Sequence, residues 1–273
     1  MLGTVLAGGE HDLAVLLRGL PMIAAGPLIG IPEKYWESVA FHATASIAPD
    51  DPIYAIGRST TDTLRRAHHH LFIAFTETLG ACPAGGASLV SALRAVELEG
   101  RPLDDHALLL NSYSFSLGAN STTSHVAAQL LLALAERPGV WQAVRDDRSL
   151  IPGLLDEGVR WSSPTNHLVR RVNTDTTLGG TQLQEGDWAC AWVGSANRDE
   201  TVFASPYEFD PRRSPNPHLG FGGGPHYCIG APASRLLLQL MLEEFADAGS
   251  NGTSSWANAS KTVSLTCTRR SPN

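Results

Sequence analysis

The segment from Phe221 to Gly230 reads Phe-Gly-Gly-Gly-Pro-His-Tyr-Cys-Ile-Gly and places one cysteine in a glycine-rich loop. Three consecutive glycines let the backbone approach a flat ligand closely and take up dihedral angles closed to other residues. An apolar run, Leu236 to Leu242, follows and predicts a helix that Cys228 begins. The positive end of that helix favours a thiolate, which is an electron-donating axial ligand for iron. The chemistry expected of this loop is therefore metal ligation by Cys228, whereas a lone cysteine is more often a small buried hydrophobe.

This loop resembles the haem-binding loop of the cytochrome P450 family, Phe-Gly-x-Gly-x-His-x-Cys-x-Gly, and matches every fixed position. The resemblance implies a haem b whose iron takes Cys228 as its axial thiolate. It also implies that His226 contacts one of the two haem propionates. The remaining loop residues that the pattern assigns to haem binding are Phe221, Gly222, Gly224 and Gly230.

Glu157 and Arg160 form a Glu-x-x-Arg pair on a predicted helix. Such a pair says little alone, because ion pairs at this spacing are common on helix surfaces. Here it precedes the cysteine loop in the order seen in P450 proteins. The resemblance implies that an arginine from a later loop joins the pair and braces the proximal side of the haem. We expect Arg213 in that role, in preference to Arg212.

The haem propionates need cationic partners wherever water does not solvate them. Arg171, at the start of the predicted β region, resembles the second propionate ligand of the family. The segment after it is one residue shorter than usual, so Arg170 stays open as an alternative. A plain surface arginine is the remaining interpretation.

The segment Gly118 to Thr123 resembles the family's distal pattern Ala-Gly-x-Asp/Glu-Thr-Thr on a long helix. The resemblance implies that Ala119 makes room for oxygen beside the haem and that the Thr122 hydroxyl relays protons. Ser121 stands where the family has its acid. A hydroxyl can hold a water but cannot replace a carboxylate as a proton reservoir, so we expect altered proton delivery.

The elements expected around these residues are mainly helical. Apolar periodicity and capping residues predict helices over 33–45, 53–79, 89–96, 105–135, 140–144 and 150–161. Short strands are expected at 168–172, 176–178 and 188–193, with a further candidate at 262–268. The run of His68, His69 and His70 is read as solvated, because adjacent helical residues diverge and cannot close on one metal ion. The expectation is one P450-like domain over 1–273 with a small β region, in which 249–273 form a weakly structured tail.

Bulk composition limits the partners and the compartment. A net charge of −7 with no basic stripe argues against nucleic acid as a partner. Four widely spaced cysteines without a CxxC pair favour a reducing cytoplasm over a disulfide framework. The first residues contain neither a signal sequence nor an apolar anchor, which points away from a membrane and toward the bacterial kind of P450.

The segment Leu13 to Glu33 resembles the middle of a bacterial P450. The usual N-terminal part, roughly a third of the family fold, is therefore expected to be lacking. Its loss would uncover the distal face, and an uncovered apolar face favours a partner chain.

The resemblance implies a haem-thiolate monooxygenase or peroxygenase that acts on a small organic molecule in bacterial natural-product biosynthesis. Electrons would come from a ferredoxin and its reductase, or peroxide would serve directly. Two alternatives stay open: an accessory or scaffold protein without oxidase activity, and a haem enzyme that performs a non-oxidative rearrangement or cyclisation. Ser121 and the unmatched N-terminal part favour these alternatives, while the Cys228 loop and Thr122 favour an oxidase. A fourth interpretation is an incomplete reading frame.

Overall fold

The computed structural model describes residues 13–250, and side chains from residue 16 to residue 247. The helices are α2 (Leu13–Arg18), α3 (Leu20–Ile29), α4 (Trp36–Ile47), α5 (Thr60–Ala81), α6 (Leu89–Leu93), α7 (Asp105–Glu136), α8 (Pro138–Asp146), α9 (Ile151–Ser162), α10 (Val193–Ala196) and α11 (Ala231–Ser250). Short 3₁₀ turns are η1 (Glu33–Tyr35), η2 (Arg148–Leu150) and η3 (Gly224–His226). The mainly helical fold class expected from the sequence is confirmed.

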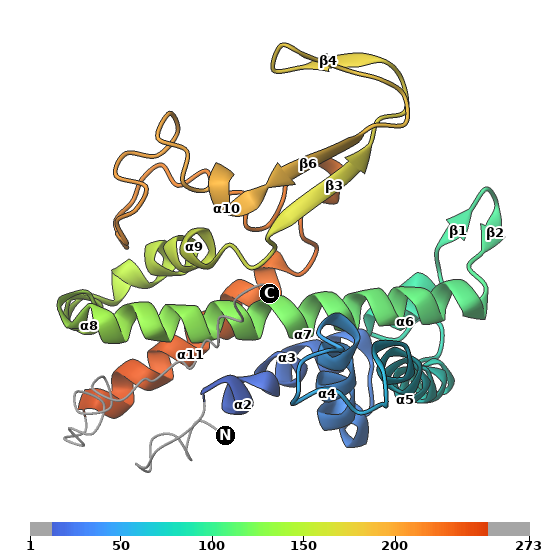
Figure 1. Ribbon diagram of the computed structural model, residues 1–273. Coiled ribbons are helices and arrows are strands. Elements are labelled where there is room, and N and C mark those ends of the chain that lie inside the picture. The colour runs from blue at the N-terminus through green and yellow to red at the C-terminus, as the bar shows by residue number, and fades with distance from the viewer. Residues whose placement is uncertain (1–12, 251–273) are drawn as a thin grey trace.

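The long helix α7 is the central axis on which the other elements pack (Figure 1). It begins where the sequence predicts, because the Asp104 carboxylate accepts the backbone N–H of Ala107 at 2.8 Å and caps the helix. One apolar cluster surrounds the N-terminal half of α7 and contains Leu108 together with residues of α3, α4 and α5. A second cluster surrounds its C-terminal half, where Leu130 and Leu134 pack with residues of α8, α9 and α11.

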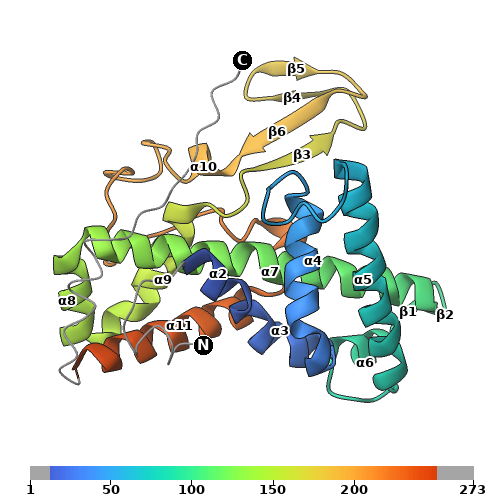
Figure 2. The same ribbon diagram turned by 60° about the horizontal axis from the view of Figure 1, so that its bottom comes forward.

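The β region lies on the side of α7 opposite to α2, α3 and α4 (Figure 1). The strands are β1 (Glu97–Leu98), β2 (Arg101–Pro102), β3 (His167–Arg171), β4 (Thr176–Leu178), β5 (Thr181–Leu183) and β6 (Trp188–Trp192). Within residues 13–250 they form three two-stranded antiparallel sheets, β1–β2, β3–β6 and β4–β5. The β3–β6 pair is joined by the β4–β5 hairpin, which projects beyond it (Figure 2).

The largest difference from the expected helix boundaries is at the start of α5. The helix expected over 53–79 begins at Thr60, because Ser59 caps it and turns occupy the segment before it. Pro52 and Gly57 favour those turns over a continuous helix. Helix α11 ends at Ser250, so only the first two residues of the tail expected over 249–273 lie among the described residues. Residues 251–273, with the strand expected at 262–268, lie outside the described residues.

The strands expected from the sequence lie close to the observed ones. The expected strands at 168–172 and 188–193 each lie one residue from β3 and β6, and 176–178 coincides with β4. Strand β5, the β1–β2 hairpin and α10 were not expected, because segments this short carry no periodicity of their own. No helix among residues 13–250 combines the length and the apolar character needed to cross a membrane.

Candidate functional site

The Cys228 loop is held in one conformation by its own backbone. The Cys228 N–H donates to the Phe221 carbonyl at 2.9 Å, which closes the loop upon itself. Gly222 and Gly224 have φ angles of 73° and 61°, which side chains with a Cβ adopt only under strain. Cys228 is half-buried and lies just before α11, so its sulfur is close to the N-terminal end of that helix.

Open space borders this loop. A Cβ atom added at Gly223 or Gly224 would meet no other atom within 4 Å. The same holds at Gly118 on α7. Tyr227 and Ile229, which flank Cys228, are 50% and 72% exposed. The loop therefore offers an uncovered, partly apolar surface on either side of the cysteine.

The distal segment of α7 is tied to the first turns of α11. The hydroxyl oxygens of Thr123 and Ser234 lie 3.0 Å apart, and Thr123 is buried. Because Ser234 follows the Cys228 loop directly in α11, this hydrogen bond places the segment Gly118–Thr123 beside that loop. The segment is part of one uninterrupted helix.

The two expected distal hydroxyls both donate to their own helix. Thr122 Oγ1 donates to the Gly118 carbonyl at 2.7 Å, and Ser121 Oγ donates to the Leu117 carbonyl at 2.8 Å. Such bonds to the preceding turn are usual for hydroxyl side chains within helices, and they leave each oxygen free to accept. Ala119 is half-buried, while Gly118 beside it is exposed and has free space around its Cα.

The structure brings Glu157, Arg160 and Arg213 together. Glu157 and Arg160 are fully buried and form two hydrogen bonds of 2.7 Å. Arg213 Nε lies 3.2 Å from Glu157 Oε2, whereas Arg212 is exposed. Burial alone would raise the pKa of the Glu157 carboxyl, yet the hydrogen bonds from Arg160 and from the Asp210 N–H hold that pKa below its ordinary value.

This triad fastens a long loop onto α9. Arg160 donates to the carbonyls of Asn197, Pro206 and Glu208 at 2.8–3.0 Å. Asn197 is fully buried and its side-chain oxygen accepts the Leu219 N–H at 2.7 Å. The sequence pattern Ala196–Asp199 carries Asn197, but spacing alone does not reveal that it joins the triad to the segment leading into the Cys228 loop.

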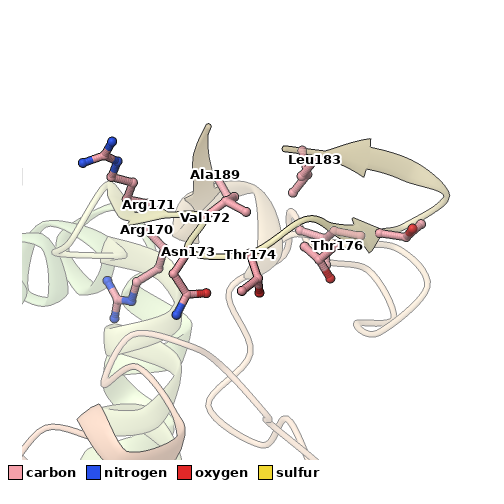
Figure 3. Close-up of a pocket in the computed structure, with 10 residues that line it drawn as sticks. Arg170, Arg171, Val172, Asn173, Thr174, Thr176, Leu183 and Ala189 are labelled. Atoms are coloured by element: carbon pink, nitrogen blue, oxygen red, sulfur yellow. The ribbon is translucent and has the colours of Figure 1, made fainter. Parts of the chain in front are cut away.

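Arg170 and Arg171 point to opposite sides of β3 (Figure 3). Arg171 reaches the turn at Gly186, where its Nη2 lies 3.7 Å from the position of an added Cβ. Arg170 extends from the other face of the strand, toward the helices in that view (Figure 3). Alternation along the strand therefore places Arg170, the alternative left open by the sequence, on the face toward the helices and Arg171 on the other face. Both arginines border an open pocket of about 260 Å³ between the strands of the β region, which no residue of the Cys228 loop lines.

His226 ends the turn η3 and is exposed beside the open space. The residues present fit a flat metal-bearing cofactor: one thiol, a glycine-lined loop beside open space, and cationic side chains nearby. Within residues 13–250, no group of three or more His, Cys, Asp or Glu residues is arranged to hold a metal ion. In the histidine run, His68 hydrogen-bonds to Tyr113 at 3.0 Å, while His69 and His70 are exposed.

Comparisons with known proteins identify the same family that the Cys228 loop resembles. A family model described as cytochrome P450 matches residues 85–246. Cytochrome P450 126 of Mycobacterium tuberculosis is 37% identical over 254 residues, which cover 89% of this chain and 60% of the relative. The steroid C26-monooxygenase of the same species is 37% identical over 155 residues, covering 57% of this chain and 42% of that protein.

Solved structures agree with the sequence matches. CYP268A2 of Mycobacterium marinum, in complex with pseudoionone, superposes with a TM-score of 0.84 at 31% identity, covering 89% of this chain and 60% of that one. HmtN, a post-tailoring hydroxylase of himastatin biosynthesis, gives a TM-score of 0.78 at 29% identity and covers 90% of this chain and 63% of that one. The chain thus spans about 60% of the length of the first curated relatives that it matches.

Proposed function

This chain belongs to the cytochrome P450 family, and from that premise we propose that it binds haem b through the Cys228 thiolate and serves as a monooxygenase or peroxygenase. The observation that carries the proposal is the closed Cys228 loop, bordered by open space and tied to the Gly118–Thr123 segment by the Thr123–Ser234 hydrogen bond. A haem with a thiolate ligand supplies oxygen activation and transfer when it is bound.

The chain's own residues would bind and orient that cofactor. Cys228 would supply the sulfur ligand, and the ring of Phe221 and the glycines of the loop would form the surface that the cofactor contacts. His226 and Arg170, which extends toward the helices, would supply charge or hydrogen bonds to the propionates, with Arg171 as the alternative. The triad of Glu157, Arg160 and Arg213 keeps the preceding loop in place.

Proton movement on the distal side depends on the hydroxyls of Thr122 and Ser121. Each donates its hydrogen to a helix carbonyl and can accept a hydrogen bond from water on the open side. To deliver a proton, Thr122 must turn its hydrogen away from the Gly118 carbonyl and take another from solvent. Ser121 has no ionisable proton to replace the one delivered, so solvent is the source.

The substrate is proposed to be a small organic molecule of natural-product metabolism. HmtN and a protein described as cytochrome P450 NovI of Streptomyces niveus support this class, since HmtN is a hydroxylase of himastatin biosynthesis. Electrons come from a ferredoxin and its reductase, or peroxide replaces both. The cytoplasm is the proposed location, because Cys82, Cys190 and Cys228 are unpaired and unpaired cysteines are typical of a reducing compartment.

A second candidate function follows from Ser121. Since its hydroxyl donates to the Leu117 carbonyl and carries no acid, the site also suits a haem-dependent rearrangement or cyclisation that needs no proton delivery to oxygen. An accessory role without oxidase activity is the further alternative. It would rest on a partner chain that covers exposed apolar side chains, such as Ile23 and Leu28 of α3, which are more than half exposed.

The absorption spectrum of the reduced, CO-bound protein tests the proposal. Haem-thiolate ligation gives a strongly red-shifted Soret band, which Cys228→Ala must abolish. Cys190→Ala is the matched control, because Cys190 is an exposed, unpaired cysteine on β6 and its loss should leave the band unchanged. A folded protein that stays colourless with added haem contradicts haem binding. Product formation with a ferredoxin system or peroxide then separates oxidation from the non-oxidative alternative.

A further inference from the structure

Two neighbouring carboxylates on α9 hold two different parts of the chain. Glu157 binds the arginines of the triad, while Asp156 turns to α11 and binds Arg235. Arg235 Nη2 and Nε lie 2.8 Å and 3.1 Å from Asp156 Oδ1. Both side chains are slightly more than one-third exposed, so the ion pair sits at the edge of the protein interior.

Arg235 also touches both ends of the Cys228 loop. Its guanidinium carbon lies 4.5 Å from the ring centroid of Phe221, which is a cation–π contact. Its Nη1 lies 3.3 Å from the hydroxyl of Tyr227, the residue before Cys228. Since the Phe221 carbonyl accepts the Cys228 N–H, the arginine rests on the residue whose backbone closes the loop.

His218, in the segment before the Cys228 loop, contacts both Asp156 and Phe221. Its side chain is only 5% exposed, and its Nε2 lies 3.6 Å from Asp156 Oδ1. Its Nδ1 accepts the Gly220 N–H at 3.2 Å, and its ring lies 5.9 Å from that of Phe221. The contact with His218 lowers the pKa of the Asp156 carboxyl against the effect of burial, and Arg235 lowers it further. Asp156 is therefore ionised at neutral pH and can hold both partners.

We propose that Asp156, Arg235 and His218 are positioning residues that clamp the Cys228 loop onto α9 through the ring of Phe221. Removing the clamp frees the loop backbone while the triad at Glu157 stays intact, because the two carboxylates hold separate partners. The consequence for the cysteine as a metal ligand rests on the proposed function. The clamp itself is a property of the chain and can be measured without haem.

Hydrogen–deuterium exchange of the Cys228 amide tests the clamp directly. This amide is protected by its bond to Phe221, so its exchange reports how often the loop opens. We expect Arg235→Gln and Asp156→Asn each to speed its exchange by about five- to ten-fold, as expected for a partly exposed ion pair with two hydrogen bonds. The double variant should exchange more slowly than the product of the two single effects predicts, because both changes break the shared Asp156–Arg235 ion pair.

Arg148→Gln is the matched control. It removes another ion pair to α11, between Arg148 of η2 and Asp247, with a separation of 3.0 Å, near the opposite end of α11 from the Cys228 loop. Equal acceleration in Arg148→Gln, or no acceleration in the Arg235 and Asp156 variants, overturns the clamp. Arg235→Lys keeps the charge but loses the planar contact with Phe221, so the Cys228 amide should exchange at a rate between those of the parent and Arg235→Gln. This milder variant keeps the test available should Arg235→Gln fail to fold.

The CO-bound spectrum separates this inference from the proposed function. In a haem-loaded protein, Arg235→Gln should lower the share of the thiolate-ligated form in proportion to the extra loop opening. A protein that binds no haem but shows the exchange pattern refutes the function and supports the clamp. Normal haem ligation with unchanged exchange refutes the clamp alone.

Discussion

Arg213 offers the sharpest test of how the proximal loop is held. Arg213→Ala removes the 3.2 Å contact with Glu157 and the bonds to the carbonyls of Ala204, Ser205 and Glu208. Arg212→Ala is the control, because Arg212 is its exposed neighbour in the same loop. The two variants delete the same side chain from adjacent positions, so their difference isolates the buried contact.

The expected loss of stability in Arg213→Ala depends on which hydrogen bonds of Glu157 remain. Hydrogen bonds to charged groups contribute about 1.5–3 kcal/mol, and orphaning a buried charge costs about 3–5 kcal/mol. Glu157 keeps both 2.7 Å bonds to Arg160, so it is not orphaned by the loss of Arg213. We therefore expect Arg213→Ala to lower the free energy of unfolding by about 2–4 kcal/mol, and Tm by roughly 5–15 °C. Arg212→Ala should lie within about 0.5 kcal/mol of the parent.

Thermal and denaturant unfolding followed by circular dichroism measure both variants. The pKa of Glu157 is lowered in the folded chain, so its contribution is present above the unfolded pKa of about 4.3 and is lost as pH falls through the folded value. The difference between the parent and Arg213→Ala should thus be constant near neutral pH and narrow only below about pH 4. Equal stabilities for Arg213→Ala and Arg212→Ala, or a difference that vanishes already near pH 6, would refute the reasoning.

Two further sets of substitutions test the proton source and the propionate partner of the site. Ser121→Asp places an acid beside Thr122 that can replace a delivered proton, so the ratio of product formed to reductant consumed should rise; an unchanged ratio means that protons arrive by another route. Arg170→Gln should weaken haem retention by about ten-fold, as expected for loss of a charge-assisted bond, whereas Arg171→Gln, on the opposite face of β3, should change it little. Haem titration of both variants decides between them, and the reverse order would restore Arg171 as the propionate ligand.

Much of the site was readable from the chain because its signals are local. The Cys228 loop needs glycines where φ is positive, and Gly222 and Gly224 stand at such positions. The start of α7 follows from Asp104, whose carboxylate caps the helix through its own neighbours. The family resemblance was carried by these same short segments and is confirmed by the match over residues 85–246.

What the sequence left undecided depends on contacts between distant residues. Strand alternation separates Arg170 from Arg171, but only the placement of β3 above the helices shows which one faces them. The partners of Asp156 come from α11 and from the segment before the Cys228 loop, and nothing in its spacing distinguishes it from a surface acid. Glu157 is the next residue in α9 after Asp156. Glu157 nevertheless faces Arg160 and Arg213 while Asp156 faces Arg235 and His218, because successive helical residues point in different directions. Local chemistry thus determined the ligand loop and the helix cap, while long-range packing decided which charges hold that loop in place.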